Sequence, residues 1–233
     1  MKIECVWEHN GTDTLLYANN LPGAFTRGID LDSAMLKMDA EVCSYLKWSG
    51  ISASGNIQLE IVQDAPCELN VQDADSDVLF VSERAPLTRD EYDTLKALTI
   101  KSAKDFLELY QSIPNKNVSA APPRTTFYGA VPRTAEEMYQ HTKNVNAYYF
   151  GEIGIEADNH GDILDCRQRG FDVLEQQPDF LLNCVFEGSY GEAWTVRKVM
   201  RRFIWHDRIH AKAMYRMAVR IFGKENIPNM FCF

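Results

Sequence analysis

Three of the five histidines fall in stretches whose apolar spacing predicts the buried face of a helix. His206 and His210 are four residues apart, and His141 belongs to an earlier helical stretch. Residues at i and i+4 lie on one face of a helix, so both imidazoles can reach one point. Neutral imidazole nitrogen is a good ligand for zinc, nickel, copper or iron. The pattern therefore predicts a divalent metal site with His141, His206 and His210 as its ligands.

A simpler interpretation stays open for each histidine, because a core imidazole is often merely hydrogen-bonded. Three imidazoles buried on two helices favour one shared partner. Three protein ligands leave the fourth position of a tetrahedral ion free, which is typical of catalytic rather than structural sites. Such an ion would acidify a bound water or a substrate thiol. His9 and His160 lie beside Asn or Gly in predicted loops, and we expect both at the surface.

The string from His206 to His210 resembles H-E-x-x-H, in which the acidic residue is the general base of a zinc peptidase. Asp207 occupies the acidic position but is shorter than Glu, and Glu225 is the only acidic residue after position 210. The sequence therefore argues against a peptidase. It also contains no Walker loop and no G-x-S-x-G motif.

Four helical stretches in the second half would position the histidines. Capping boxes, in which a hydroxyl and a glutamate satisfy backbone amides at a helix start, are predicted at Thr88, Thr134 and Ser189. We expect helices over residues 88–113, 134–155, 162–177 and 189–222. Four helices of this length, separated by short or proline-rich loops, are typical of a four-helix bundle.

The first half has a different pattern, with short β-type runs around one helix. Apolar residues recur at helical spacing from Asp30 to Trp48. Predicted strands cover residues 3–7, 14–18, 57–62 and 78–81. The order β-β-α-β-β is an α+β pattern. We therefore expect an α+β domain over residues 1–85, followed by an all-α domain over residues 86–233.

Charge is divided unevenly between the two halves. Residues 1–85 hold 5 basic and 14 acidic residues, whereas the rest of the chain holds 19 of each. An acidic front half argues against binding of a nucleic-acid backbone, and we expect no nucleic-acid partner. Residues 192–224 carry 9 basic and 2 acidic residues. These form either the solvated face of a long helix or a docking surface for the acidic half.

The composition, with 45% hydrophobic and 24% charged residues, is typical of a globular protein and excludes a disordered chain. No apolar run approaches the ~18 residues that a membrane span needs, and no apolar signal core follows the first residues. The six cysteines are scattered without a C-x-x-C pair, which indicates free thiols in a reducing compartment. We therefore expect a cytoplasmic protein without a membrane partner.

Over about residues 88–222 the chain resembles the DinB-like metal-binding superfamily. The resemblance rests on the bundle layout, on His141 within Met138-Tyr139-Gln140-His141, and on the Trp-His-x-x-x-His string from Trp205 to His210. In that family three such histidines bind a divalent ion, often nickel or zinc. Characterised relatives include thiol-dependent S-transferases and a maleylpyruvate isomerase. The resemblance implies a metal-dependent enzyme that activates a low-molecular-weight thiol toward a small-molecule substrate, and a possible homodimer.

Over about residues 15–48 the chain resembles HicB-like antitoxin domains. The segment Asn20-Leu21-Pro22-Gly23 and the following helix start carry this resemblance. Because the sequence shows no added DNA-binding ribbon or helix-turn-helix, the resemblance implies a fold rather than an antitoxin function. Two alternatives to a thiol-dependent enzyme stay open. One is a metal-binding protein without turnover, in stress response or assembly, and the other is a regulatory binding protein.

Overall fold

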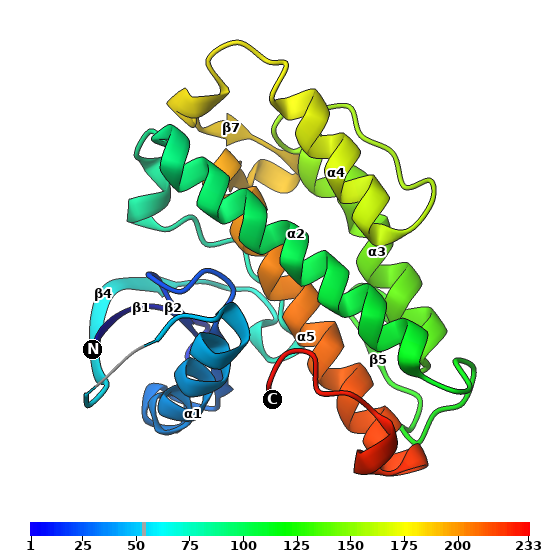
Figure 1. Ribbon diagram of the computed structural model, residues 1–233. Helices are drawn as coiled ribbons and strands as arrows, with labels where there is room; N and C mark the ends of the chain where they lie inside the picture. The colour runs from blue at the N-terminus through cyan, green and yellow to red at the C-terminus, as the bar shows by residue number, and fades with distance from the viewer. Residues whose placement is uncertain (53–54) are drawn as a thin grey trace.

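The computed structural model of the chain describes residues 1–52 and 55–233, within which it has five α-helices. The N-terminal module, residues 1–85, holds a four-stranded sheet and one helix (Figure 1). The helical module, residues 86–233, holds the other four helices and two short strand pairs. The structure thus confirms the coarse prediction of a sheet-containing front half followed by helices.

The sheet has the spatial order β3-β2-β1-β4. Its strands are β1 (Lys2–His9), β2 (Thr14–Ala18), β3 (Phe25–Gly28) and β4 (Gln58–Pro66). β1 is antiparallel to β2 and parallel to β4, and the crossover from β3 to β4 contains α1 (Leu31–Ser49). Buried side chains of α1 pack on one face of the sheet, and Trp205 of the helical module packs with the other face. The N-terminal module is therefore covered on that face by the helical module.

Three of the four predicted strands are confirmed as β1, β2 and β4, but the strand predicted over residues 78–81 is wrong. Side chains, rather than a neighbouring strand, form hydrogen bonds with the backbone of this segment. The Val78 amide donates to Glu8, and the Val78 carbonyl accepts from Arg201. The order is β-β-β-α-β rather than β-β-α-β-β, because β3 precedes α1.

All four helices predicted for the second half are present and pack against one another. They are α2 (Arg89–Ser112), α3 (Ala135–Gly151), α4 (Ile163–Leu174) and α5 (Val196–Phe222). In Figure 1, α2 crosses in front of α5, and α3 and α4 lie beside this pair. The capping boxes predicted at Thr88 and Thr134 are confirmed. The ends of α3 and α4 come earlier than predicted, whereas α2 and α5 end within one residue of the prediction.

The capping box predicted at Ser189 is wrong, because the N-cap of α5 is Thr195, whose side chain accepts from the amide of Lys198. Ser189–Gly191 instead forms a single 3-10 turn, with the short strands β7 and β8 pairing on either side of it. β7 covers Phe186–Glu187, and β8 covers Ala193–Trp194. The amide of Ser189 donates a hydrogen bond to the carboxylate of Glu152, the residue that directly follows α3. A partner distant in sequence therefore replaces the predicted cap.

Buried ion pairs join α5 to the N-terminal module. Arg201 donates to both carboxylate oxygens of Glu83, and Arg208 donates to Glu41. Each of these four residues is at most 5% exposed. Arg201 and Arg208 thus dock α5 on the acidic half, whereas Arg216 and Arg220 near the end of α5 are exposed to solvent. Each of the two interpretations therefore holds for part of this basic stretch.

Gly23 provides a test of this close packing, because its φ is +89° and an added Cβ would lie 2.4 Å from Cγ2 of Ile204. We expect Gly23→Ala to lower the free energy of unfolding by about 2–4 kcal/mol, from left-handed strain plus a clash in a packed core. Gly11 has a φ of +86° with nothing within 4 Å of an added Cβ, so Gly11→Ala should cost only about 1 kcal/mol. Urea unfolding measures both, and equal losses would contradict the close contact.

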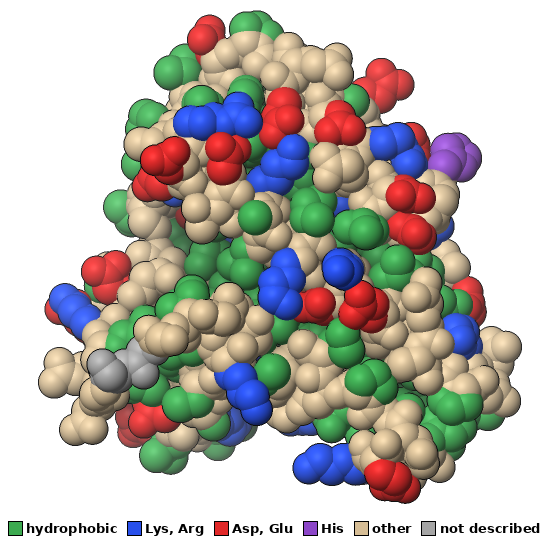
Figure 2. All heavy atoms as spheres, viewed as in Figure 1, with side chains coloured by type: hydrophobic (Ala, Val, Ile, Leu, Met, Phe, Trp, Pro, Cys, Tyr) green, Lys and Arg blue, Asp and Glu red, His purple; other side chains and the backbone are tan. Residues whose placement is uncertain are grey.

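Within the described residues, no helix has the length and apolar character needed to cross a membrane. The face shown in Figure 2 has Lys and Arg side chains interspersed with Asp and Glu, rather than one continuous basic patch. All six cysteines are free thiols.

Candidate metal centre

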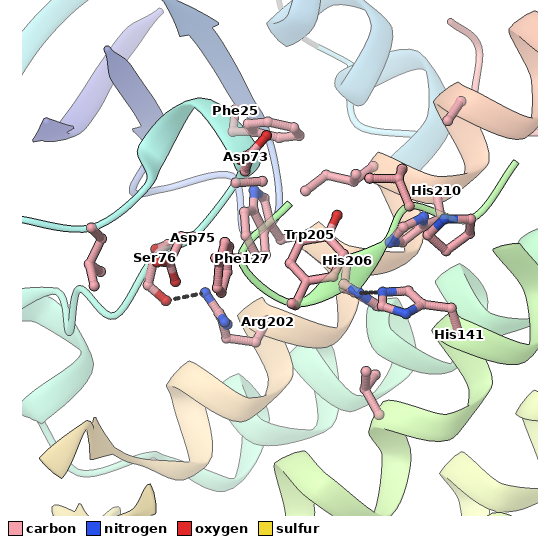
Figure 3. Close-up of a pocket in the computed structure, with 18 of the residues that line it drawn as sticks. Phe25, Asp73, Asp75, Ser76, Phe127, His141, Arg202, Trp205, His206 and His210 are labelled. Atoms are coloured by element: carbon pink, nitrogen blue, oxygen red, sulfur yellow. Dashed lines mark hydrogen bonds between the residues drawn. The ribbon is translucent and has the colours of Figure 1, made fainter. Parts of the chain in front are cut away.

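The three predicted histidines meet where α3 faces α5. His141 lies on α3, and His206 and His210 lie one turn apart on α5. The Nε2 atoms of His141 and His206 are 3.2 Å apart, and one nitrogen from each of the three rings lies within 4.8 Å of the others. Figure 3 shows the three rings gathered at one place. The structure therefore brings together all three side chains that the sequence predicts as ligands.

Neighbouring aromatic rings frame this cluster. His206 is buried, with 8% of its surface exposed, and His141 and His210 are partly buried. Tyr149 packs 6.1 Å from the His206 ring, and Tyr128 lies 6.1 Å from the His141 ring, measured between ring centres. Tyr128 comes from the loop between the short strands β5 (Thr125–Thr126) and β6 (Gly129–Ala130). Aromatic rings from α3 and from this loop therefore border the cluster.

Burial keeps the three imidazoles neutral. It lowers the pKa of His206 well below its usual range, and the nearby His210 and His141 lower it further. Burial, together with His141, lowers the pKa of His210 to about 3, and burial also lowers the pKa of His141. A neutral imidazole is the form that binds a metal ion, so these rings need lose no proton to bind one at neutral pH.

The lowered pKa values predict that the metal-free chain loses stability as the pH falls below about 6.5. Below that pH the imidazoles are protonated in the unfolded chain but stay neutral in the fold, so added protons favour unfolding. For each imidazole the loss should be on the order of 1 kcal/mol per pH unit, until the folded pKa is reached. Urea unfolding of chelator-treated protein between pH 7.5 and 5.5 measures the slope. His206→Leu should reduce the slope by about a third, because one of three imidazoles is removed, and an unchanged slope would contradict a buried neutral His206.

The donor set fits a divalent transition metal. Two nitrogen ligands at about 2.0–2.1 Å from a tetrahedral ion are about 3.3 Å apart, close to the separation of 3.2 Å between His141 and His206. Within the described residues, the cluster contains three imidazoles and no carboxylate or thiol. Such nitrogen ligands suit zinc, nickel, copper or iron rather than calcium or magnesium. The cluster could therefore hold a metal ion through three protein ligands.

Asp207 is directed away from the histidines. Its two carboxylate oxygens each accept from Arg167 of α4 at 3.2 Å, and both side chains are fully buried. A carboxylate held in this way cannot act as a general base beside the cluster. The geometry thus supports the sequence argument against a zinc peptidase.

The histidines line one end of a cavity of about 920 Å³ that lies between the two modules (Figure 3). Its size is in the range of small-molecule binding sites. The N-terminal module, the loop before α3 and the helix α5 all contribute to its wall. Lining residues from these segments include Phe25, Asp73, Ser76, Phe127, Arg202 and Trp205.

Most of this cavity could not be predicted from the sequence. The N-terminal residues in its wall come from segments with no spacing pattern that connects them to the histidines. Arg202 gave a usable signal, because it precedes His206 by one helical turn and shares its helix face.

The other two histidines lie apart from the cluster. The prediction of a surface loop at His9 is wrong, because His9 ends β1 and is only partly exposed. Its ring stacks on Trp7 and contacts the carboxylate of Asp64 at 2.9 Å. His160 is exposed in the segment between α3 and α4, as predicted. His160 therefore offers a control position for variants of the metal site.

Comparisons of the chain with known protein families, curated proteins and solved structures find no match. The DinB-like and HicB-like resemblances thus stay proposals. The function has to be inferred from the histidine cluster and the cavity beside it.

Proposed function

We propose that this chain is a DinB-like, divalent-metal-dependent enzyme that activates a low-molecular-weight thiol, in an S-transferase or isomerase reaction. The observation that carries the proposal is the convergence of three neutral imidazoles, from two helices, at the end of a cavity. Zinc or nickel suits this donor set. A site built only for structural support would have little use for an adjoining cavity of this size.

Each part of the site has a role in this proposal. His141, His206 and His210 would hold the ion, which when bound supplies the Lewis acidity that lowers the pKa of a thiol. The aromatic side chains of Tyr149 and Trp205 keep bulk water from one wall of the cavity, which strengthens electrostatic interactions inside it. The open part of the cavity would admit the thiol and its electrophilic acceptor.

The N-terminal module completes the cavity wall, and this is the role that we propose for its HicB-like fold. Phe25 and Ser76 both line the cavity, although they lie far from the histidines in sequence. The buried pairs that Arg201 and Arg208 form with this module fix its position on α5. An antitoxin-like or regulatory function is not needed to explain this arrangement.

Elemental analysis of the full chain, purified without chelators, is the first test. We expect about one zinc or nickel ion per chain. The loaded chain is then assayed with glutathione, cysteine and coenzyme A against an electrophilic acceptor such as 1-chloro-2,4-dinitrobenzene. Turnover that disappears with chelator supports the proposal. Absence of metal uptake would contradict it, and metal uptake without turnover across a broad set of thiols favours the non-catalytic metal-binding alternative.

A further inference from the structure

Arg202 is the one buried cation in the described part of the chain that has no carboxylate within 4 Å. The other buried cations each form an ion pair with a carboxylate; they are Arg167, Lys198, Arg201 and Arg208. A charge taken out of water is costly unless an opposite charge compensates it. The missing partner of Arg202 is therefore a feature that needs an explanation.

The contacts that Arg202 does make are with uncharged groups. Its Nη1 donates to the carbonyl of Ser76 at 2.8 Å, and its Nε is buried without a hydrogen-bond partner. The guanidinium lies 4.6 Å from the centre of the Trp205 ring. These contacts fix the orientation of the side chain but leave its charge unpaired.

Three carboxylates influence the charge of Arg202, and each has another partner. Asp75, which lines the same cavity, accepts from the amide of Asn70. Glu8 accepts from the amides of Asp77 and Val78 and from the Tyr17 hydroxyl. Glu192 lies 2.8 Å from the ammonium of Lys198. These acids influence the field around Arg202 without forming a direct pair with it.

Arg202 also lines the cavity that contains the histidine cluster. It precedes His206 by four residues, so the two side chains leave the same helix face about 6 Å apart along the axis of α5. Figure 3 shows Arg202 between Ser76 and the three histidines. A molecule of only a few bonds could contact the guanidinium and the histidine cluster together.

We propose that Arg202 binds the carboxylate of the small molecule that reacts at the histidine cluster. A guanidinium pairs with a carboxylate through two parallel hydrogen bonds, which gives both charge neutralisation and orientation. The ligand class is thus a short carboxylic acid with a thiol or an electrophilic carbon a few bonds away. The reaction at the cluster rests on the proposed function, whereas the carboxylate site rests on Arg202 itself.

The test compares two thiols that differ in one group. Zinc-loaded full chain is titrated calorimetrically with 3-mercaptopropionate and with 2-mercaptoethanol. We expect the carboxylate to improve binding about 10- to 100-fold, the effect of a hydrogen bond to a charged group. Equal affinities in the wild-type chain would overturn the proposal without any variant.

Variants then test whether the carboxylate of the ligand binds at Arg202. Arg202→Gln should lose the preference while keeping zinc stoichiometry, and Arg202→Lys should keep only part of it because an ammonium lacks the planar fork. Arg216 lines the same cavity but is exposed, so Arg216→Gln should change the preference less than about 3-fold. A full preference in folded Arg202→Gln would overturn the proposal, since the carboxylate would then bind elsewhere, for example at the zinc ion.

A metal-free measurement separates this inference from the proposed function. Ligand-observed NMR of chelator-treated chain should show binding of propionate in preference to 1-propanol, and Arg202→Gln should remove it. If the chain binds no metal but prefers propionate, the proposed function fails and the carboxylate site stands. If the chain binds metal but shows no preference for propionate or for 3-mercaptopropionate, only the carboxylate site fails.

Discussion

Replacement of His206 by alanine is expected to reduce zinc and nickel binding from about one ion per chain to almost none. His206 is the most buried of the three ligands and lies within hydrogen-bond distance of His141. Loss of one of three protein ligands should weaken binding by more than the roughly 10- to 100-fold effect of losing a supporting group outside the coordination shell. Competition with a chromophoric chelator measures the affinity.

The control for this prediction is His160→Ala, which removes an exposed imidazole outside the cluster. It should bind metal as the wild-type chain does, whereas His141→Ala and His210→Ala should fail as His206→Ala does. Metal at 100 times its Kd should stabilise the wild-type fold by about 2.7 kcal/mol, and this gain should vanish in His206→Ala. If all four variants retain metal equally, the ligand assignment is wrong.

The histidine cluster was predictable because its information is local in sequence. His206 and His210 share a helix face by their spacing alone, and His141 lies on the apolar face of another helix. Thr88 and Thr134 located two of the helix starts, since a capping box is complete within four residues. Helices that pack side by side then bring such faces together.

The wrong predictions concern the strand over residues 78–81 and the capping box at Ser189. Both segments form hydrogen bonds with partners that are distant in sequence, which a local pattern does not contain. Val78 alternates with Phe80 as a strand would, yet Glu8 and Arg201 occupy its backbone groups. Ser189 fits a capping box, yet Glu152 binds its amide. No local pattern distinguishes these outcomes from a strand or a helix start.

The cationic residues of α5 show the same division between local and distant information. In the sequence, these cations could face either solvent or the acidic N-terminal half. Their spacing did not distinguish between the two. Arg201 is buried with Glu83 and Arg208 with Glu41 of the acidic half, whereas Arg216 and Arg220 are exposed. The same buried surroundings leave Arg202 without a charged partner, so a sequence-level charge count could not identify it as a ligand-binding residue.

The buried pair between Arg167 and Asp207 carries the largest predicted effect on stability. Both side chains are fully buried, and the guanidinium also lies 3.7 Å from the centre of the Phe203 ring. Asp207→Asn keeps the shape but removes the charge that compensates Arg167. Since an uncompensated buried charge remains, the free energy of unfolding should fall by about 3–5 kcal/mol in urea unfolding.

The exposed pair between Asp158 and Arg169 is a matched control, because Arg169 lies on the same helix as Arg167 and both partners are more than two-fifths exposed. Asp158→Asn should change stability by no more than about 1 kcal/mol. The double variant Arg167→Leu/Asp207→Leu should recover much of the loss seen in Asp207→Asn, because apolar residues leave no unpaired charge. Equal losses in Asp207→Asn and in the double variant would show that shape, rather than charge compensation, makes this pair important. In that case the same reasoning about the unpaired charge of Arg202 would lose its physical basis.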